Sequence, residues 1–275
     1  MSRRFLPEAL AGLPIRALDA ADQMRLNQIR ACSYLHLFDS FETSLSVVAR
    51  ERAHLDVEVR ETLTPLLRLD SFDHHELFDA FEAAFFEAFP VKPRLVPLPD
   101  DYVRTLTFAT PLSLLVLALH FKLVTQQHYL ACVRGDESLE PHFVRLLKEH
   151  WSVECGGGKK TERPALEIQL ALGKALPGRI PSALRDYRLL VFSCDDVLRR
   201  QAELDVQTLE EARGLGALAA AARTSVVAAQ VAAHRKAFLT VGIVNAAFVY
   251  AMRTLGPTAP SVLAGVVAAL SSRSR

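Results

Sequence analysis

Cysteine and glycine are scarce in this sequence. Its 275 residues include only 4 cysteines and 12 glycines. The cysteines Cys32, Cys132, Cys155 and Cys194 form no CxxC pair and no regular spacing, which argues against a disulfide framework and indicates a reducing, intracellular compartment. The low glycine content, with half of the residues hydrophobic, is typical of a globular, helix-rich protein.

An excess of charge is also missing. The chain has 32 basic and 31 acidic residues, so it offers no electrostatic case for nucleic acid as a partner. We therefore expect no nucleic-acid binding.

Long hydrophobic runs are absent too. The uncharged helical run 237–252 has 16 residues, short of the about 18 to 20 that a membrane span needs. The uncharged tail 254–272 is longer, but Pro257, Pro260 and its small residues favour a packed final helix. Residues 1–7 are basic, without the apolar stretch of a signal peptide. These features predict a soluble, cytoplasmic protein without a membrane span.

The residues that are present predict an all-α fold. Apolar positions recur three and four residues apart, and no segment shows convincing strand alternation. We expect one helical domain over 1–275, with core helices at about 19–155 and C-terminal helices at about 165–272. Prolines between 90 and 99 predict an extended linker. The predicted helices cover about 19–48, 55–89 with a kink at Pro65, a buried helix from Pro111, a fourth helix ending near Glu154, 165–175, 182–213, 216–253 and a short tail.

Several polar residues fall on the inner faces of these helices. His150 and Glu154 are four residues apart, so they share one face of the fourth helix. A third ligand one turn later would stand at Gly157, which has no side chain. Glu42 lies among aromatic residues of the first helix, His74 lies in the second, and Lys122 lies in the apolar third helix. Four-helix bundles that bind two metal ions project carboxylates and histidines inward in this way.

With this pattern the chain resembles the ferritin-like di-iron carboxylate proteins, and among them the aryl-amine N-oxygenase type. That type adds a histidine four residues before its last Glu-x-x-His, as His150 precedes Glu154 here. The segments 33–38, 123–129 and 238–242 look like bacterial members of the superfamily. The resemblance implies a ferritin-like bundle with a central four-helix core and additional C-terminal helices.

The resemblance also implies which metal ligands are kept and which are replaced. Four of seven ligand positions match, namely Glu42, His74, His150 and Glu154. The other three are Ser71, Lys122 and Gly157, where the family has two carboxylates and a histidine. Asp70, Asp73 and Cys155 are the neighbours that could substitute, with Asp70 the best placed, one turn before His74.

Lys122 is the most informative replacement, because it exchanges a carboxylate for a cation. A buried ammonium beside carboxylates can itself supply the charge of a metal ion. We therefore expect Lys122 to pair with Glu42 or Glu154 where the family holds metal, and expect no cofactor.

Three functions are consistent with these residues. The first is a ferritin-like pseudoenzyme that binds a small molecule in the bundle interior or a protein. The second is a non-haem oxygenase or oxidase with mononuclear or dinuclear iron, since two histidines and one or two carboxylates are enough for one iron. The third is a structural helical module whose polar interior is a salt-bridge network. A homodimer is possible with each of the three functions. The sequence does not indicate a substrate or a redox partner.

Overall fold

The computed structural model describes residues 3–7, 15–67, 72–154 and 164–273. For residues 72–75 and 153–154 it describes the backbone alone. The described residues form helices and contain no strand, apart from one isolated bridge between Arg4 and Leu139. The predicted all-α class is confirmed.

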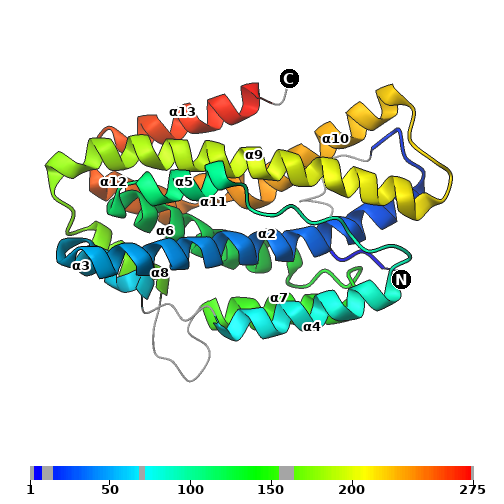
Figure 1. The fold of residues 1–275 in the computed structure, drawn as a ribbon, viewed down its shortest axis with the longest axis horizontal. Helices are drawn as coiled ribbons and strands as arrows, with labels where there is room; N and C mark the ends of the chain where they lie inside the picture. Colours follow the sequence, from blue (N-terminus) through cyan, green and yellow to red (C-terminus); the bar gives the residue numbers. More distant parts are fainter. Residues whose placement is uncertain (1–2, 8–14, 68–71, 155–163, 274–275) are drawn as a thin grey trace.

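Two long helices run along the molecule. They are α2 (Ala20–Leu55) and α9 (Ile180–Arg213), which pack against each other in opposite directions (Figure 1). α2 begins where the sequence predicts, because the Asp19 carboxylate accepts a hydrogen bond of 2.8 Å from the Asp22 N–H at its first turn. α9 ends at Gly214, whose φ of 65° is a left-handed conformation that glycine adopts without steric cost.

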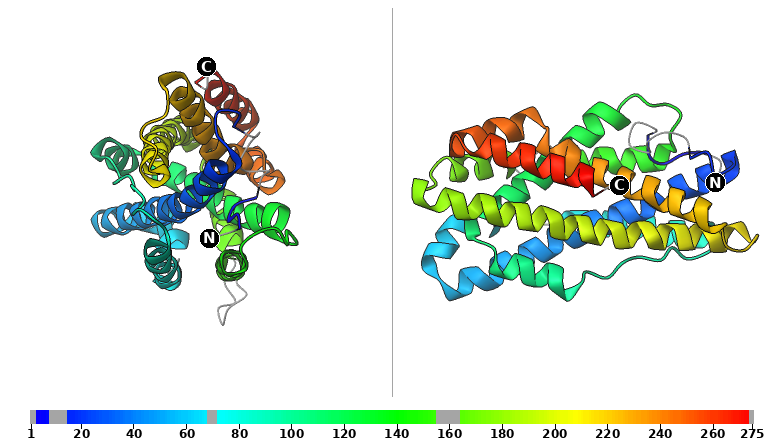
Figure 2. Two further views of the ribbon diagram at one scale, coloured as in Figure 1. Left: turned by 90° about the vertical axis from the view of Figure 1, so that its right-hand side faces the viewer. Right: turned by 90° about the horizontal axis from the view of Figure 1, so that it is seen from above.

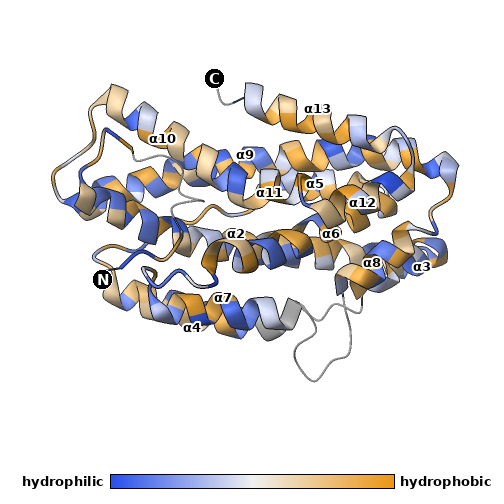
Figure 3. Ribbon diagram, turned by 180° about the vertical axis from the view of Figure 1, so that it is seen from behind, coloured by the Kyte–Doolittle hydropathy of each residue, from blue (hydrophilic) through white to orange (hydrophobic). Residues whose placement is uncertain are grey.

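The other helices pack around this pair (Figure 2). α6 is buried along nearly its whole length, as the apolar sequence from Leu112 to Val124 predicts. α9 instead alternates hydrophilic and hydrophobic residues, as expected for a helix with one buried face (Figure 3). The remaining elements are α3 (Val57–Leu67), α4 (Phe72–Ala88), α5 (Asp100–Phe108), α6 (Pro111–His128), η1 (Tyr129–Val133), α7 (Pro141–Glu154), α8 (Pro164–Leu172), η2 (Pro177–Arg179), α10 (Ala220–Arg235), η3 (Lys236–Thr240), α11 (Val241–Ile243), α12 (Ala246–Leu255) and α13 (Ala259–Ser272).

Two predicted helices are each divided in the structure. In place of one helix over 55–89 there are α3, which packs on α2, α6 and α8, and α4, which packs on α2 and α7. The predicted helix over 216–253 is interrupted at Asn245, whose side chain caps α12 by accepting from the N–H groups of Ala247 and Phe248. The two parts are bent by 52°. The predicted linker at 90–99 is confirmed as lacking helix, but α5, which follows it, was not predicted.

No single helix in the described ranges is long and apolar enough to cross a membrane, and two bent helix pairs reach that length only by joining across a break.

The helices that carry the predicted site residues enclose a common interior. α2 packs on α4, α4 on α7, α7 on α6, and α6 on α2, so these four helices form a closed circuit. A hydrophobic cluster continues from this interior across α9 to α13. The circuit brings residues from distant parts of the sequence to one place.

Candidate functional site

Lys122 and Glu42 form an ion pair between α6 and α2, beside α3. Lys122 Nζ lies 2.7 Å from Glu42 Oε1, and both residues are buried. Glu42 comes from α2, one turn after Phe38, and Lys122 comes from the buried helix α6. Of the two partners predicted for Lys122, Glu42 and Glu154, the structure shows the pairing with Glu42, while the side chain of Glu154 lies outside the described part of the chain.

The space around this ion pair is small. Its cavity has a volume of about 20 Å³ and is lined by Glu42, Leu45, Ser46, Leu66, Ala118, Phe121 and Lys122. A single water molecule needs at least about 10 to 15 Å³. The cavity can therefore hold about one water molecule and has no room for an organic ligand.

His150 lies in the same interior but in an aromatic environment. It is 1% exposed, and its ring sits edge-on to Phe38 of α2 and Phe78 of α4, with ring centroids 5.0 Å away in each case. Phe38, which contacts His150, precedes Glu42 by one turn of α2. Glu42 and His150 are both buried, while their predicted role as remnant metal ligands stays a prediction.

The remaining predicted ligands cannot be placed in the same way. The side chains of His74, near the start of α4, and of Glu154, at the end of α7, lie outside the described part of the chain. Ser71 and Gly157 also lie outside the described residues, as do the substitutes Asp70, Asp73 and Cys155, of which Asp73 is described by its backbone alone. Among the side chains that are described, no group of three or more histidines, cysteines, aspartates or glutamates could hold a metal ion.

Other polar and aromatic side chains of the interior have structural partners. His120 and His128 are structural, because both are buried and each bonds to a tyrosine hydroxyl, those of Tyr187 at 2.7 Å and Tyr34 at 2.8 Å. Burial lowers the pKa of each histidine to about 4. Trp151 stacks on Tyr129 with ring centroids 5.0 Å apart. Cys32, Cys132 and Cys194 are free thiols.

A second buried polar network centres on Asp205 of α9, and the sequence reasoning missed it. Its carboxylate accepts hydrogen bonds from Gln201 (2.7 Å), Gln230 (2.7 Å) and Ser33 (3.2 Å), and it lies 2.7 Å from His234 Nε2. A histidine–aspartate pair can serve catalysis, but Asp205 and His234 are 0% and 1% exposed, so no substrate reaches them. The network therefore joins α2, α9 and α10 structurally.

A signal for this network was present in the sequence. Asp195 and Asp205 stand at positions of α9 where the three-to-four spacing places apolar residues, such as Leu198, Ala202 and Leu209. An acidic residue in an apolar stripe needs buried partners. Asp195 pairs with the buried Arg235 and with the more exposed Arg199 and Arg273.

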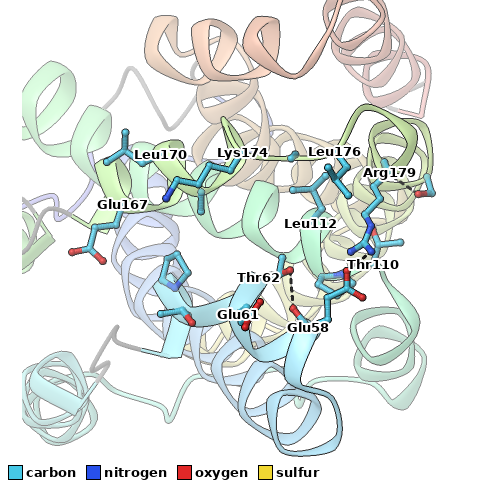
Figure 4. Close-up of a pocket in the computed structure, with 16 residues that line it drawn as sticks. Glu58, Glu61, Thr62, Thr110, Leu112, Glu167, Leu170, Lys174, Leu176 and Arg179 are labelled. Atoms are coloured by element: carbon cyan, nitrogen blue, oxygen red, sulfur yellow. Dashed lines mark hydrogen bonds and ion pairs between the residues drawn. The ribbon is translucent and has the colours of Figure 1, made fainter.

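Among the described residues, a large cleft shares no lining residue with the small cavity at the ion pair. The cleft has a volume of about 1040 Å³ and forms where α3, the start of α6, α8 and the start of α9 meet (Figure 4). Its charged residues are Glu58, Glu61, Glu167, Lys174 and Arg179, and its apolar residues are Pro65, Pro111, Leu112, Leu170, Ala171, Ala175 and Leu176. The cleft is formed by four segments that are separate in the sequence. No single sequence motif therefore predicts it.

Comparisons with known proteins identify no relative. No family model matches the chain, and neither the curated proteins nor the solved structures contain a match.

Proposed function

We propose that the protein is a binding module on a ferritin-like bundle, in which the Lys122–Glu42 ion pair occupies the place of a di-metal site. The observation that carries this proposal is the separation of 2.7 Å between Lys122 Nζ and Glu42 Oε1, which joins α2 and α6, two of the four helices of the circuit. The ferritin-like part rests on the sequence resemblance together with this helix circuit.

The electrostatics of the pair oppose a metal ion at the same place. A cation about 4 Å from the ammonium would be repelled by on the order of 4 kcal/mol per unit charge at the effective dielectric constant of protein sites. The Glu42 carboxylate already has the Lys122 ammonium as its counter-ion, and the cavity beside it has a volume of about 20 Å³. Both features favour a bundle without di-iron chemistry.

The proposal that the protein binds a ligand rests on the volumes of two cavities. The interior cavity at the ion pair has room for about one water, whereas the cleft at the α3–α8 end has a volume of about 1040 Å³. Ligand sites are typically concave, largely apolar and furnished with a few polar groups, and the cleft has these features. We therefore place ligand binding in the cleft rather than at the ion pair.

The first experiment is elemental analysis of the protein purified from iron-replete cells. We expect iron and manganese well below one ion per chain. Two ions per chain would overturn the proposal. One ion per chain that is lost in His150→Ala, with an unchanged melting temperature, would instead support the metal-dependent oxygenase.

The second experiment tests the ferritin-like ancestry. A Ser71→Glu, Lys122→Glu, Gly157→His triple variant restores the family's ligand types, and we expect it to gain bound iron. Lys122→Met is the matched control, since it removes the ammonium without adding a ligand. A folded triple variant, judged by circular dichroism, that binds no more iron than this control would contradict the ancestry.

A further inference from the structure

The cleft at the α3–α8 end carries two opposite charges on facing walls. Glu61 lies on α3, and Lys174 follows the end of α8 and extends into the space between α8 and α3 (Figure 4). Neither side chain forms an ion pair or hydrogen bond with another residue in the part of the chain that the structure describes. Each is therefore available to a ligand.

The neighbouring charges are already engaged. Arg179 pairs with Glu58 at one end of the cleft, and Glu167 has an interaction of its own. The cleft thus offers one carboxylate and one ammonium to an incoming molecule, rather than an excess of one sign. A ligand with a single charge would satisfy only one of them.

The floor and the rim between these charges are apolar. Leu112 is buried at the start of α6, while Leu170 and Leu176 on the upper wall are 59% and 61% exposed. Covering exposed leucine surface releases about 25 cal/mol per Å² of apolar area. An apolar ligand body between the two charges would gain this contribution.

We propose that the cleft binds a zwitterionic ligand with an apolar body, of the size of a short apolar peptide with free termini. Its ammonium group pairs with Glu61, its carboxylate pairs with Lys174, and its side chains cover Leu112, Leu170 and Leu176. The volume of about 1040 Å³ accommodates a molecule of this size. This inference rests on the proposed binding function and specifies its ligand class.

The test is isothermal titration calorimetry of the full chain with trileucine as the probe. Four forms are compared: free termini, N-acetylated, C-amidated and blocked at both ends. We expect the free form to bind most tightly and each block to weaken binding about fivefold, because each removes one ion pair worth up to about 1 kcal/mol.

Charge-neutral variants assign each terminus to its residue. In Glu61→Gln the N-acetyl group should no longer matter, while the C-amide still weakens binding, and Lys174→Met should show the reverse. Glu203→Gln on α9 and Lys148→Met on α7 are matched controls, because both residues are exposed and lie outside the cleft. These controls should keep the wild-type order of affinities.

Three outcomes would overturn the inference. They are no measurable binding of free trileucine, sensitivity to only one of the two blocks, and equal binding of the doubly blocked form. The last result would indicate an internal segment of a protein partner, which has no charged termini. None of these outcomes changes the metal content, so failure of the ligand class is distinguishable from failure of the proposed function.

Discussion

At the residue scale, the Lys122–Glu42 pair shows how a buried charge depends on its partner. Burying an isolated carboxylate in a bundle interior is costly, and the ammonium at 2.7 Å offsets that cost. Burial and the nearby Glu42 charge also raise the pKa of Tyr34. The neutral hydroxyl of Tyr34 thus remains available to His128.

Two buried histidines, His120 and His128, also depend on hydrogen-bond partners, although they are uncharged. Burial lowers the pKa of His120 and of His128 to about 4. Both rings are therefore uncharged at neutral pH. In the neutral ring of His120, Nε2 donates to the Phe238 carbonyl at 2.9 Å, which leaves Nδ1 to accept from the Tyr187 hydroxyl at 2.7 Å.

These histidines predict that acid destabilises the protein. Between the usual histidine pKa of about 6.5 and the folded value of about 4, the unfolded chain binds protons that the folded chain does not. The stabilisation is complete above about pH 6.5 and falls as the pH falls toward 4, by up to about 3 kcal/mol per histidine. Urea unfolding between about pH 7 and about pH 4.5 should show this loss, with a shallower pH dependence in His120→Gln. The exposed His142→Gln is the control, and parallel profiles for all three proteins would contradict the assignment.

At the scale of elements, a π-helical turn fits α10 to the central helix. η3 follows α10, and the Phe238 carbonyl within it accepts the hydrogen bond from His120 of α6. Gly242 in α11 lies against the same side chain: a Cβ there would be 2.3 Å from His120 Nε2 and 2.6 Å from Val124 Cγ2. The close approach of the two helices therefore requires glycine at this position.

We expect Gly242→Ala to destabilise the protein by about 2 kcal/mol or more. The added methyl group would overlap His120 and Val124, and overpacking in a core typically costs about 1 to 3 kcal/mol. Gly265→Ala in α13 is the matched control, since a Cβ there meets nothing within 4 Å and alanine favours helix by up to about 1 kcal/mol. Chemical denaturation compares the two. Equal stability of both variants would show that the helices can separate without cost.

At the scale of the whole molecule, buried acidic residues of α9 connect the N-terminal and C-terminal helices. Asp205 bonds to Ser33 of α2 and to Gln230 of α10. Asp195 pairs with Arg235 of α10 and with Arg273, which follows α13. Contacts of this kind hold segments that are distant in sequence in one arrangement.

We expect Asp205→Ala to cost about 3 kcal/mol or more in the free energy of unfolding. The substitution leaves Gln201, Gln230 and His234 buried without their acceptor, and each unsatisfied group costs about 1 to 3 kcal/mol. Glu203→Ala, on the exposed face of the same helix, should change stability by less than about 0.5 kcal/mol. Urea denaturation at neutral pH measures both. A similar small effect for the two variants would exclude a structural role for the network.

Local patterns in the sequence predicted the all-α class, most of the helices and several buried residues, but not α5 or the breaks in two predicted helices. Asp19 capped a helix, Pro111 began one, and the apolar residues after it marked the central helix, because caps, proline geometry and periodicity act over a few neighbouring residues. The inner positions of Glu42, Lys122 and His150 followed from the same periodicity. That Lys122 pairs with a carboxylate could be predicted, because a buried ammonium requires one, but only the structure chose Glu42 over the alternative Glu154.

Only the tertiary structure decided where the helices break and where a cleft large enough for a ligand forms. Asn245 ends one helix and caps the next because its side chain reaches two N–H groups that a continuous helix would bond internally. The partners of Asp205 come from three helices, and the cleft comes from four segments. These features depend on contacts between residues far apart in the chain, and no local period encodes them.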